Sequence, residues 1–379
     1  MHICYITHEY PKKGFSHGGI GTFLRTISRA LVNTGVQVTV VGINQYTGSY
    51  EEEMDEGVKI YRLPQKKIKG LTWWLNAKAV NTFLKQLHIT QPISIIETPE
   101  LGLAFIHKIK GIKYVIRTHG GHHFFAEAEK RGINKWKGYQ ERKSFKKADG
   151  FIAVSHYVKD HTSKFLNFEG KPIQIINYAI DTKIEVPNVE VDSNKILFAG
   201  TVCDKKGVRQ LVEAFKKVRE KYPDQKLDLY GRDWFYPNGD SYIGVLKSEY
   251  HASYFEHVTF YGSITFEDLQ LNYAQANICV FPSHMETQGL VALESMLLKK
   301  TVIFSEYGPG PETIEHQKTG LLCDVYNPDD IAKKIIWCVE NPEGAKQLGV
   351  NAQLVVKKKY DPEIILKKNL EFYNSLISS

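Results

Sequence analysis

The stretch FPSHMETQGLVALESMLL, residues 281–298, decides the fold of this chain. A short apolar run at residues 278–281 leads into it and stops at Pro282, and a second apolar run follows at residues 301–304. Both runs are predicted to be buried strands. Between them, residues 289–298 are apolar nearly all round and contain no helix breaker after the first glycine, which predicts a buried helix. The stretch therefore predicts a strand, a helix and a strand.

Two glutamates, Glu286 and Glu294, lie on either side of the start of the predicted helix. In a strand–helix–strand unit the loop that leaves the first strand lies at the carboxyl edge of a parallel sheet, where ligands usually bind. Carboxylates there can accept hydrogen bonds from the hydroxyls of sugars and riboses. The alternative is that Glu286 is held by the helix dipole and Glu294 is solvated, but the apolar neighbours of Glu294 weigh against solvation.

The order Pro-Ser, a glutamate, seven residues, a second glutamate and then LLKKTVI resembles the donor-site motif of the retaining GT-B glycosyltransferases of family 4, also called glycosyl transferases group 1. The resemblance implies that Glu286 approaches the donor sugar and that Glu294 holds the nucleotide ribose. The chain has Gln288 where the family usually has an aromatic residue. The remaining donor contacts implied in this loop are Thr287, Gln288, Gly289 and Leu290.

A glycine loop, residues 18–21, follows the first predicted strand. Glycine lets a diphosphate approach backbone N–H groups closely, although a tight turn explains the loop about as well. The first strand ends near Thr7, too far ahead of the loop for a dinucleotide-binding fingerprint. The family resemblance implies that Gly18 and Gly19 lie against the donor phosphates.

A second set of candidate donor residues begins at residues 195–200, which predict the first strand of a second domain. Lys206 comes just before Gly207 and a predicted helix, where a lysine can neutralise phosphate. The resemblance implies that Lys206 binds the donor diphosphate and takes part in catalysis. Thr201 stands where the family usually has an arginine, so one phosphate-binding cation is missing. Gly262 ends another predicted strand, at the place where the family stacks the nucleotide base.

Three histidines, His119, His122 and His123, follow a predicted strand at residues 114–117. A histidine at a strand end can point into a cleft and can both donate and accept hydrogen bonds at neutral pH. Zinc is disfavoured because no cysteine or carboxylate stands at ligand spacing and two of the histidines are adjacent, so we predict no bound metal. The family resemblance implies that His119 lies beside the reacting sugar.

The chain has 379 residues, too many for one ordinary core, and two domains are expected. A polar linker at residues 182–194 separates an N-terminal, acceptor-side domain, 1–185, from a C-terminal, nucleotide-sugar-binding domain, 190–361. The last segment, 362–379, is amphipathic. As in GT-B proteins, we expect two Rossmann-like α/β domains facing each other across a cleft, with this terminal helix crossing back to the first domain.

Composition predicts a soluble, cytoplasmic protein: 42% of the residues are hydrophobic and no apolar run approaches the roughly eighteen residues of a membrane span. The first residues carry no basic leader and no cleavage site, so we expect no signal peptide. Five scattered cysteines predict reduced thiols. The net charge is +7 and its basic excess lies in the first half, which is expected to meet an anionic ligand or surface.

Lysines at positions 66, 67 and 69 are followed by Trp73 and Trp74. We predict that the tryptophans begin a helix that packs on the core through Leu75, Val80 and Phe83. The alternative is a contact at the level of membrane headgroups, to which basic and tryptophan residues are suited.

Two charged stretches stand out along the first half of the chain. The acidic run at residues 51–56 predicts a solvated loop. Residues 127–147 are the densest basic stretch, with Trp136 and Tyr139 among the lysines and with Lys130 and Arg131 near its start. No nucleic-acid recognition motif accompanies them, so nucleic acid is not an expected partner. A solvated helix face or an anionic membrane surface explains the stretch.

The resemblance implies a retaining transfer of a hexosyl unit from a nucleotide-diphosphate sugar, with a UDP-sugar favoured. The expected acceptor is a saccharide or lipid-linked saccharide, in cell-surface polysaccharide assembly at the inner membrane face. No cofactor is expected, because a lysine and helix dipoles can offset the leaving-group charge. No side chain is an evident nucleophile, so a front-face mechanism is expected. A GT-B epimerase, a phosphorylase and a non-catalytic nucleotide-sugar-binding partner subunit remain alternatives, and glycine spacing disfavours a nicotinamide dehydrogenase.

Overall fold

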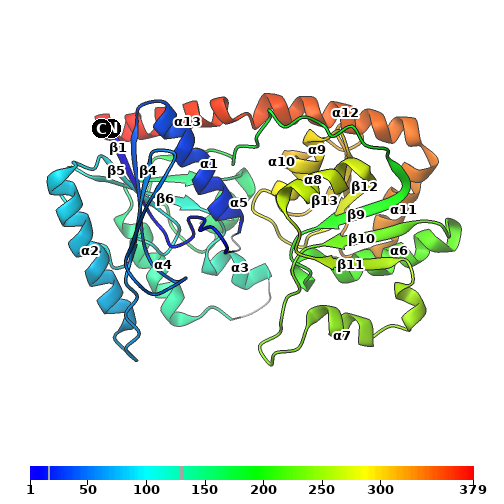
Figure 1. Cartoon of the computed structure of the whole chain (residues 1–379), viewed down its shortest axis with the longest axis horizontal. Coiled ribbons are helices and arrows are strands. Elements are labelled where there is room, and N and C mark those ends of the chain that lie inside the picture. The colour runs from blue at the N-terminus through cyan, green and yellow to red at the C-terminus, as the bar shows by residue number, and fades with distance from the viewer. Residues whose placement is uncertain (16–17, 129–131) are drawn as a thin grey trace. The chain divides into compact units, whose positions relative to one another are not determined.

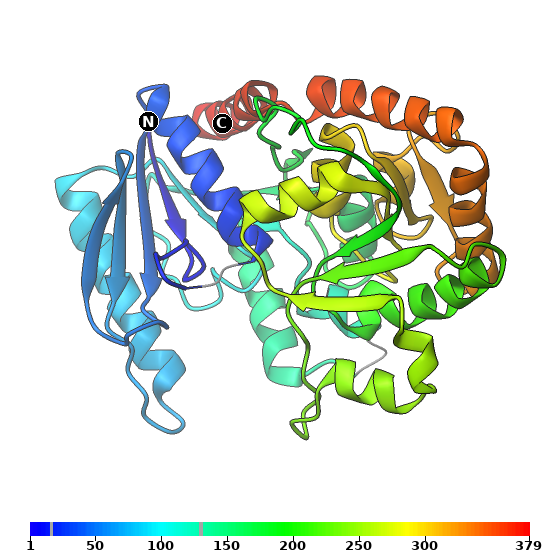
Figure 2. The same cartoon turned by 45° about the vertical axis from the view of Figure 1, so that its right-hand side comes forward.

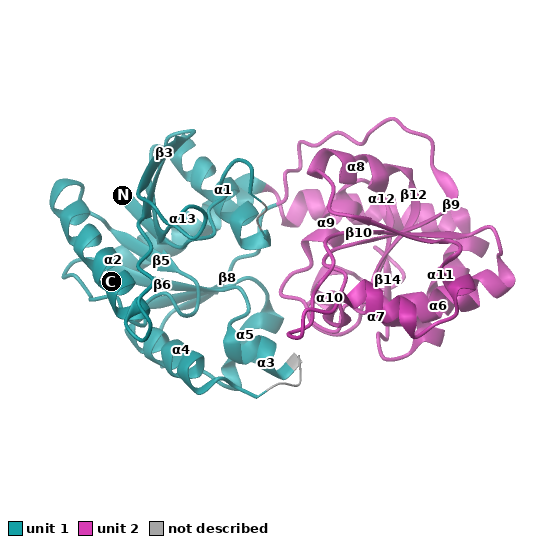
Figure 3. Ribbon diagram, turned by 60° about the horizontal axis from the view of Figure 1, so that its bottom comes forward, with its two compact units in different colours: residues 1–179, 362–379 teal, residues 180–361 magenta. Residues whose placement is uncertain are grey.

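A computed structural model describes residues 1–15, 18–128 and 132–379, and the chain divides into two compact units (Figure 1 and Figure 3). Unit 1 comprises residues 1–179 and 362–379, and unit 2 comprises residues 180–361. The boundary at residue 179 comes ahead of the linker predicted at residues 182–194. Lys130 and Arg131 of the basic stretch lie outside the described residues.

Unit 1 is built on a sheet that, within the described residues, has eight strands in the order β3-β4-β2-β1-β5-β6-β7-β8. All neighbours are parallel except β3 and β4. The strands are β1 His2–Ile6, β2 Gln37–Ile43, β3 Glu51–Asp55, β4 Val58–Leu63, β5 Ile95–Thr98, β6 Lys113–Thr118, β7 Gly150–Ala153 and β8 Ile173–Ile175. Its helices are α1 Gly19–Asn33, α2 Thr72–Thr90, α3 His122–Ala128, α4 Lys135–Lys147, α5 His156–Ser163 and α13 Pro362–Ser378.

Unit 2 is a second parallel α/β layer structure with helices on both faces of its sheet (Figure 2). Its described strands run in the order β11-β10-β9-β12-β13-β14. They are β9 Asp192–Ala199, β10 Lys226–Tyr230, β11 Val258–Gly262, β12 Ala276–Phe281, β13 Thr301–Ser305 and β14 Leu321–Cys323. The helices are α6 Val208–Lys221, α7 Tyr242–Ser248, α8 Phe266–Gln275, α9 Leu290–Leu297, α10 Gly310–Thr313, α11 Pro328–Glu340 and α12 Pro342–Lys359, with short 3-10 turns η1 Asp204–Lys206 and η2 Ala252–Phe255.

The stretch from β12 to β13 forms the strand, helix and strand predicted from its sequence. Apolar residues of β12 and β13 are almost fully buried because helices cover both faces of the sheet. Strand order reverses between β9 and β12, the two strands that pair at the centre of the sheet. Such a switch point opens a crevice at the carboxyl ends of the strands, where α/β proteins bind their ligands.

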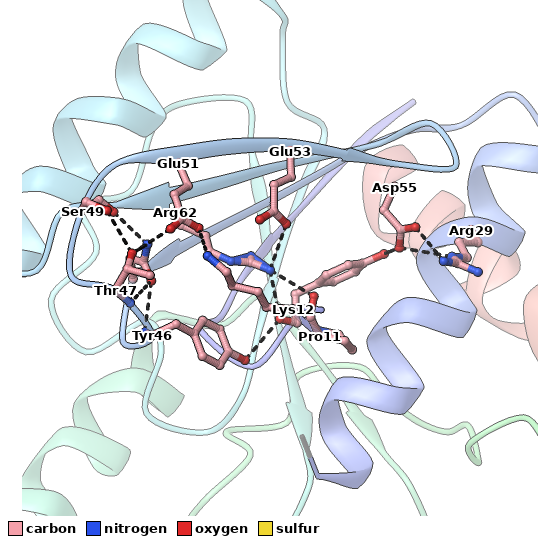
Figure 4. A network of polar contacts seen from close by, with 12 residues as sticks. Pro11, Lys12, Arg29, Tyr46, Thr47, Ser49, Glu51, Glu53, Asp55 and Arg62 are labelled. Atoms are coloured by element: carbon pink, nitrogen blue, oxygen red, sulfur yellow. Dashed lines mark hydrogen bonds and ion pairs between the residues drawn. The ribbon is translucent and has the colours of Figure 1, made fainter. Parts of the chain in front are cut away.

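The acidic run at residues 51–56 is not a solvated loop as predicted: its first five residues form the edge strand β3 (Figure 4). Three cations pair with it. The Lys12 ammonium binds Glu51, Arg62 lies 3.3 Å from Glu53, and Arg29 lies 2.6 Å from Asp55. Sequence alone could not reveal these pairs, because their basic members come from three separate segments.

The five cysteines are buried and unpaired, as expected for reduced thiols. None of the helices in the described part of the chain combines the length and apolar character needed to cross a bilayer.

The terminal helix α13 belongs to unit 1 and is held there by a buried ionic network. Arg117 on β6 binds Glu97 on β5 through Nε at 2.7 Å, and its NH2 group donates to Asn369 Oδ1 on α13 at 2.6 Å. The Tyr373 hydroxyl donates to Glu97 Oε2 at 2.6 Å. Arg117 and Glu97 are almost fully buried, so each charge depends on the other. The terminal helix was predicted to return to the first domain, and hydrogen bonds with Arg117 on β6 and Glu97 on β5 hold it there.

We predict that Glu97→Gln lowers the free energy of unfolding by about 3–5 kcal/mol, because it leaves the Arg117 charge buried without a carboxylate. Tyr373→Phe should cost about 1–2 kcal/mol, since it removes one hydrogen bond to a charged group. Lys367→Ala on the exposed face of α13 is the control and should stay within about 0.5 kcal/mol. Urea unfolding followed by circular dichroism measures all three, and equal effects of Glu97→Gln and Lys367→Ala would contradict the role given to the network.

Candidate active site

The loop between β12 and α9, together with helix α9, carries most of the predicted donor residues. Pro282 ends β12, and Gly289 precedes α9 with φ of +78°. A Cβ on Gly289 would lie 2.5 Å from the Phe304 ring on β13, so both the backbone angle and the close packing require glycine there. Leu290 is the first residue of α9, Gln288 is buried and Thr287 is half-buried.

A second loop, residues 200–207, packs directly on this one. Gly207 has φ of +69°, and a Cβ there would lie 1.9 Å from the Pro282 carbonyl oxygen. The His284 N–H donates to the Lys205 carbonyl at 3.0 Å. This contact brings the Lys206 ammonium to the Glu286 carboxylate, with which it forms an ion pair, and the Ser283 hydroxyl donates to the same carboxylate at 3.3 Å. Two residues that lie far apart in the sequence thus meet at the carboxyl edge of the sheet.

Glu294 lies in the second turn of α9 and is half-buried. Burial raises the pKa of its carboxyl to about 7. No described side chain donates a hydrogen bond or an ionic contact to this carboxyl. Burial, with the charge of Glu294 added to it, raises the pKa of Tyr273, whose hydroxyl has no hydrogen-bond partner among the described residues. A half-buried carboxyl without a protein donor is suited to a ligand that supplies hydroxyl groups.

The remaining predicted donor residues of unit 2 lie at neighbouring strand ends. Thr201 follows β9 and is half-buried, and Gly262 ends β11 with φ of +72°. Beside Gly262, the half-exposed Tyr261 ring stacks on Tyr230 with 4.6 Å between centroids and 6° between planes. Gly308, φ +72°, opens a further turn before α10. The structure therefore gathers these predicted unit 2 residues at one edge of the sheet.

Gly18, Gly19 and His119 belong to unit 1. Gly19 begins α1, both glycines are exposed, and a Cβ on Gly18 would meet no atom within 4 Å. Gly18 has φ of −95°, which any residue can adopt, so its backbone does not require glycine. The free space around Gly18 leaves room for a ligand to approach its backbone.

His119 follows β6 and is 7% exposed. The backbone N–H of His119 donates to Glu100 Oε1 at 2.6 Å, and its ring Nδ1 lies 2.5 Å from the Tyr178 hydroxyl. Burial lowers the pKa of His119 to about 3, and the Arg117 charge acts in the same direction. The imidazole is therefore neutral at physiological pH, and it can serve as a hydrogen-bonding group but carries no charge.

The three neighbouring histidines engage different partners. His122 Nε2 accepts from the Asn134 N–H at 2.8 Å, and His123 Nδ1 pairs with the Glu141 carboxylate. No cluster of three potential metal ligands occurs within residues 1–15, 18–128 and 132–379.

Two carboxyl groups that sequence reasoning missed hold the histidine loop. Glu141 on α4 is fully buried and accepts from the N–H groups of His122 and His123. Burial raises the pKa of Glu100 to about 8, and the Glu141 charge adds to the shift. The only sequence signal was the position of Glu100 shortly after a buried strand; Glu141 lies inside the basic stretch, where it looks like an ordinary surface residue.

Glu100 also lines a cavity of about 610 Å³ at the carboxyl edge of the unit 1 sheet. The loops after β1 and β5 contribute to its wall, and these two strands form the switch point of that sheet. The polar lining residues are Thr7, His8, Glu9, Gln45, Gln65, Asn76, Glu100, His122 and Lys137. Unit 1 therefore has a cavity of its own, lined by both polar and apolar residues and large enough for a sugar residue.

Comparison with known proteins finds a family model for each unit. Residues 17–184 match the family model Glycosyltransferase Family 4, and residues 179–355 match the model Glycosyl transferases group 1. The chain is a GT-B glycosyltransferase of the group 1/family 4 type. An uncharacterized glycosyltransferase from Methanocaldococcus jannaschii is 27% identical over 316 residues, which cover 82% of this chain and 83% of the relative.

Two solved structures show the same fold as this glycosyltransferase. Sucrose-phosphate synthase from Thermosynechococcus elongatus has a TM-score of 0.86 at 22% identity, covering 100% of this chain and 99% of that one. The Anabaena protein HepE, solved in complex with UDP-glucose, has a TM-score of 0.76 at 16% identity, covering 99% and 100%. These likenesses confirm the GT-B fold predicted from the sequence motif.

We predict that Gly207→Ala destabilises the glycosyltransferase more than Gly239→Ala does. Both glycines have positive φ, but a Cβ at Gly239 meets nothing within 4 Å, whereas one at Gly207 collides with Pro282. The two variants share the cost of the backbone conformation, roughly 1 kcal/mol, and the clash should add about 1–3 kcal/mol at Gly207. Urea unfolding of the variants gives the difference, and equal destabilisation would show that the two loops separate without cost.

Proposed function

We propose that this glycosyltransferase transfers a hexosyl unit, with retention of anomeric configuration, from a nucleotide-diphosphate sugar to a saccharide or lipid-linked saccharide. A UDP-sugar is the favoured donor, and the process served is cell-surface polysaccharide assembly. The observation that carries the proposal is the convergence of Lys206 and Glu286 at the carboxyl edge of the unit 2 sheet, beside the α9 helix that bears Glu294.

Each of these groups matches one part of the donor. The Lys206 ammonium can bind the diphosphate, which would compete with Glu286 for it. Glu286, once released, can accept hydrogen bonds from the hydroxyls of the transferred sugar. The Glu294 carboxyl has no protein donor and can accept from a ribose diol.

The reaction breaks the bond between the anomeric carbon and the diphosphate oxygen and forms one between that carbon and the acceptor oxygen. The acceptor proton passes to the departing diphosphate. Lys206 and the N–H groups at helix starts would stabilise the charge on the leaving group, so no metal is needed in this proposal. The catalytic role expected of His119 stays a prediction. The UDP-glucose held by HepE supports the choice of donor only by analogy of fold.

We also propose that the protein acts in the cytoplasm and attaches peripherally to the inner face of the membrane, where lipid-linked acceptors are held. A second candidate function is a non-catalytic subunit that binds a nucleotide sugar without transferring it. Thr201, standing where the family usually has an arginine, is the observation that favours this alternative.

We expect Lys206→Ala and Glu294→Ala each to lower kcat/KM for sugar transfer by about 10²-fold or more, because each removes a proposed contact to the donor. Lys217→Ala, which alters an exposed ion pair with Asp329 on the same unit, is the control and should keep wild-type activity. Transfer is followed with radiolabelled donor, and anomeric configuration by NMR of the product. Near-normal transfer in both site variants would refute the mechanism, and donor binding without transfer or hydrolysis in the wild type would favour the non-catalytic alternative.

A further inference from the structure

A cluster of half-exposed aromatic rings lies on unit 1, away from the residues assigned to the donor. Trp73 at the start of α2 contacts Phe105, with 4.6 Å between ring centroids, and Trp136 at the start of α4, with 5.5 Å. Trp136 stacks on Tyr139 at 5.8 Å. The exposed fractions of Trp73, Trp74, Trp136 and Tyr139 are 41–47%. The predicted helix forms as α2 and packs on the core through Val80 and Phe83, while the Trp73 and Trp74 rings at its start are half-exposed at the surface.

Exposed aliphatic side chains extend this cluster. Ile68 and Leu71 precede α2 and are 50% and 51% exposed, and Ile133 precedes α4 and is 45% exposed. In Figure 1 the start of α2 and helix α4 lie on the same, lower side of unit 1. Soluble proteins expose single apolar residues routinely, but an apolar group gathered from two helix starts marks an interaction surface.

Lysines accompany these rings, and no acidic residue lines the groove between them within the described part of the chain. A groove of about 420 Å³ is lined by Trp73, Trp74, Ala77, Lys78, Asn81, Thr82, Lys85, Phe105, His107, Lys143 and Lys147. We call this groove and the rings of Trp136 and Tyr139 the aromatic–basic face. The Lys143 ammonium lies 4.6 Å from the Phe105 ring centroid, and the Lys78 ammonium lies 5.4 Å from that of Trp74. Among the described residues, no carboxylate oxygen comes within 4.0 Å of Lys78, Lys85 or Lys143.

We infer that the aromatic–basic face docks unit 1 onto an anionic phospholipid bilayer. Tryptophan and tyrosine rings are suited to the headgroup level, Ile68, Leu71 and Ile133 to the acyl boundary beneath it, and unpaired lysines to anionic headgroups. An anionic glycan would also match lysines and aromatic rings, but it gives no reason for three exposed aliphatic side chains. The inference supplies the attachment site for the proposed peripheral location and rests on that part of the proposed function.

Vesicle co-sedimentation of the full chain tests this docking. We expect binding to vesicles of phosphatidylcholine with one-third phosphatidylglycerol, and at least tenfold weaker binding to phosphatidylcholine alone. The triple variant Lys78→Glu, Lys85→Glu, Lys143→Glu should lose most of the binding, as should Trp74→Ser. The matched control Lys333→Glu, Lys346→Glu, Lys357→Glu reverses three exposed lysines of unit 2 and should bind as wild type.

Three results would overturn the docking site: equal binding to neutral and anionic vesicles, equal binding by the triple variant and its control, or binding of a uronic-acid oligosaccharide at this face without vesicle binding. Transfer to a water-soluble saccharide acceptor is measured in parallel. The triple variant should retain it, since none of its substitutions touches a residue assigned to the donor. A wild type that binds vesicles but transfers no sugar would leave the docking intact and refute the proposed activity.

A separate observation concerns the arginine missing at Thr201. Strands β9 and β10 pair in a constant parallel register, with Ala199 opposite Tyr230, and a bridge beyond the strand ends joins Val202 to Asp233. The same register sets Thr201 opposite Arg232. The Val202 N–H donates to the Arg232 carbonyl at 2.9 Å.

The pairing is close because both loops begin with glycine: a Cβ on Gly231 would lie 1.8 Å from the Gly200 carbonyl oxygen. Laterally paired residues of a parallel ladder project toward the same side of the sheet. Arg232 is exposed, and among the described residues no carboxylate oxygen lies within 4.0 Å of its guanidinium. Asp233, its neighbour in sequence, is engaged instead with the Ser241 hydroxyl and the Ile243 N–H.

The register points to Arg232 as the cation that takes over diphosphate binding from position 201. A guanidinium in the loop after β10 would reach the same edge of the sheet as one in the loop after β9, and it is free to bind a diphosphate bidentately. This inference rests on the proposed donor site.

Isothermal titration calorimetry tests the assignment without relying on activity. The wild type is first titrated with UDP, GDP and ADP, and the variants are then titrated with whichever of the three binds most tightly. Arg232→Ala should weaken binding of the diphosphate at least tenfold and leave binding of the parent nucleoside unchanged. The exchange variant Thr201→Arg, Arg232→Thr should recover most of the affinity. An Arg232→Ala protein that binds the diphosphate as wild type, or that loses nucleoside binding equally, would overturn the assignment, whereas a wild type that binds none of the three would refute the proposed donor site itself.

Discussion

The close packing of two loops at the carboxyl edge of the unit 2 sheet is the constraint on which the candidate active site depends. Gly207 has no side chain to separate its turn from the Pro282 carbonyl, so the loop after β9 lies directly on the loop after β12. Because β9 and β12 are paired strands on either side of the switch point, the contact occurs where the sheet itself offers helix starts to a ligand. Lys206 and Glu286 meet as a result, and each neutralises the other in the absence of a donor.

In unit 1, the polar histidine loop after β6 is largely buried, and carboxyl groups hold it through hydrogen bonds to its backbone. Glu141 is fully buried and accepts from two successive N–H groups of the histidine loop, and Glu100 accepts from the N–H of His119. Burial of the Glu100 carboxyl raises its pKa to about 8, and repulsion from the nearby Glu141 carboxylate adds to the shift. The neutral His119 and the protonated Glu100 together keep this edge of unit 1 low in charge near neutral pH.

Charge is distributed very differently on the outer surface of the same unit. Basic side chains near α2 and α4 lie beside aromatic rings rather than beside acids, while the cations near β3 are paired with that strand's carboxylates. The basic excess of the first half of the chain is thus divided between cations that complete the fold and cations left without acidic partners. Only the second group remains available to an anionic partner.

Much of the fold was predictable from local sequence. The apolar runs around residues 281–298, the glycines before helices and the amphipathic last segment are short-range patterns, and they indicated two α/β units and the family before any coordinates. The same patterns identified Lys206, Glu286 and Glu294 as candidates, because motif spacing is a local property.

What only the tertiary structure decided involves partners distant in the sequence. The ion pair of Lys206 with Glu286, the hold of Glu141 on the histidine loop and the pairing of Thr201 with Arg232 each join segments brought together by strand register. Burial also depends on distant segments: the sequence predicts the helix that Trp73 begins, but only the position of that helix start on unit 1 leaves the ring half-exposed. Local periodicity determines which elements form, whereas register, burial and charge pairing depend on what the rest of the chain places beside them.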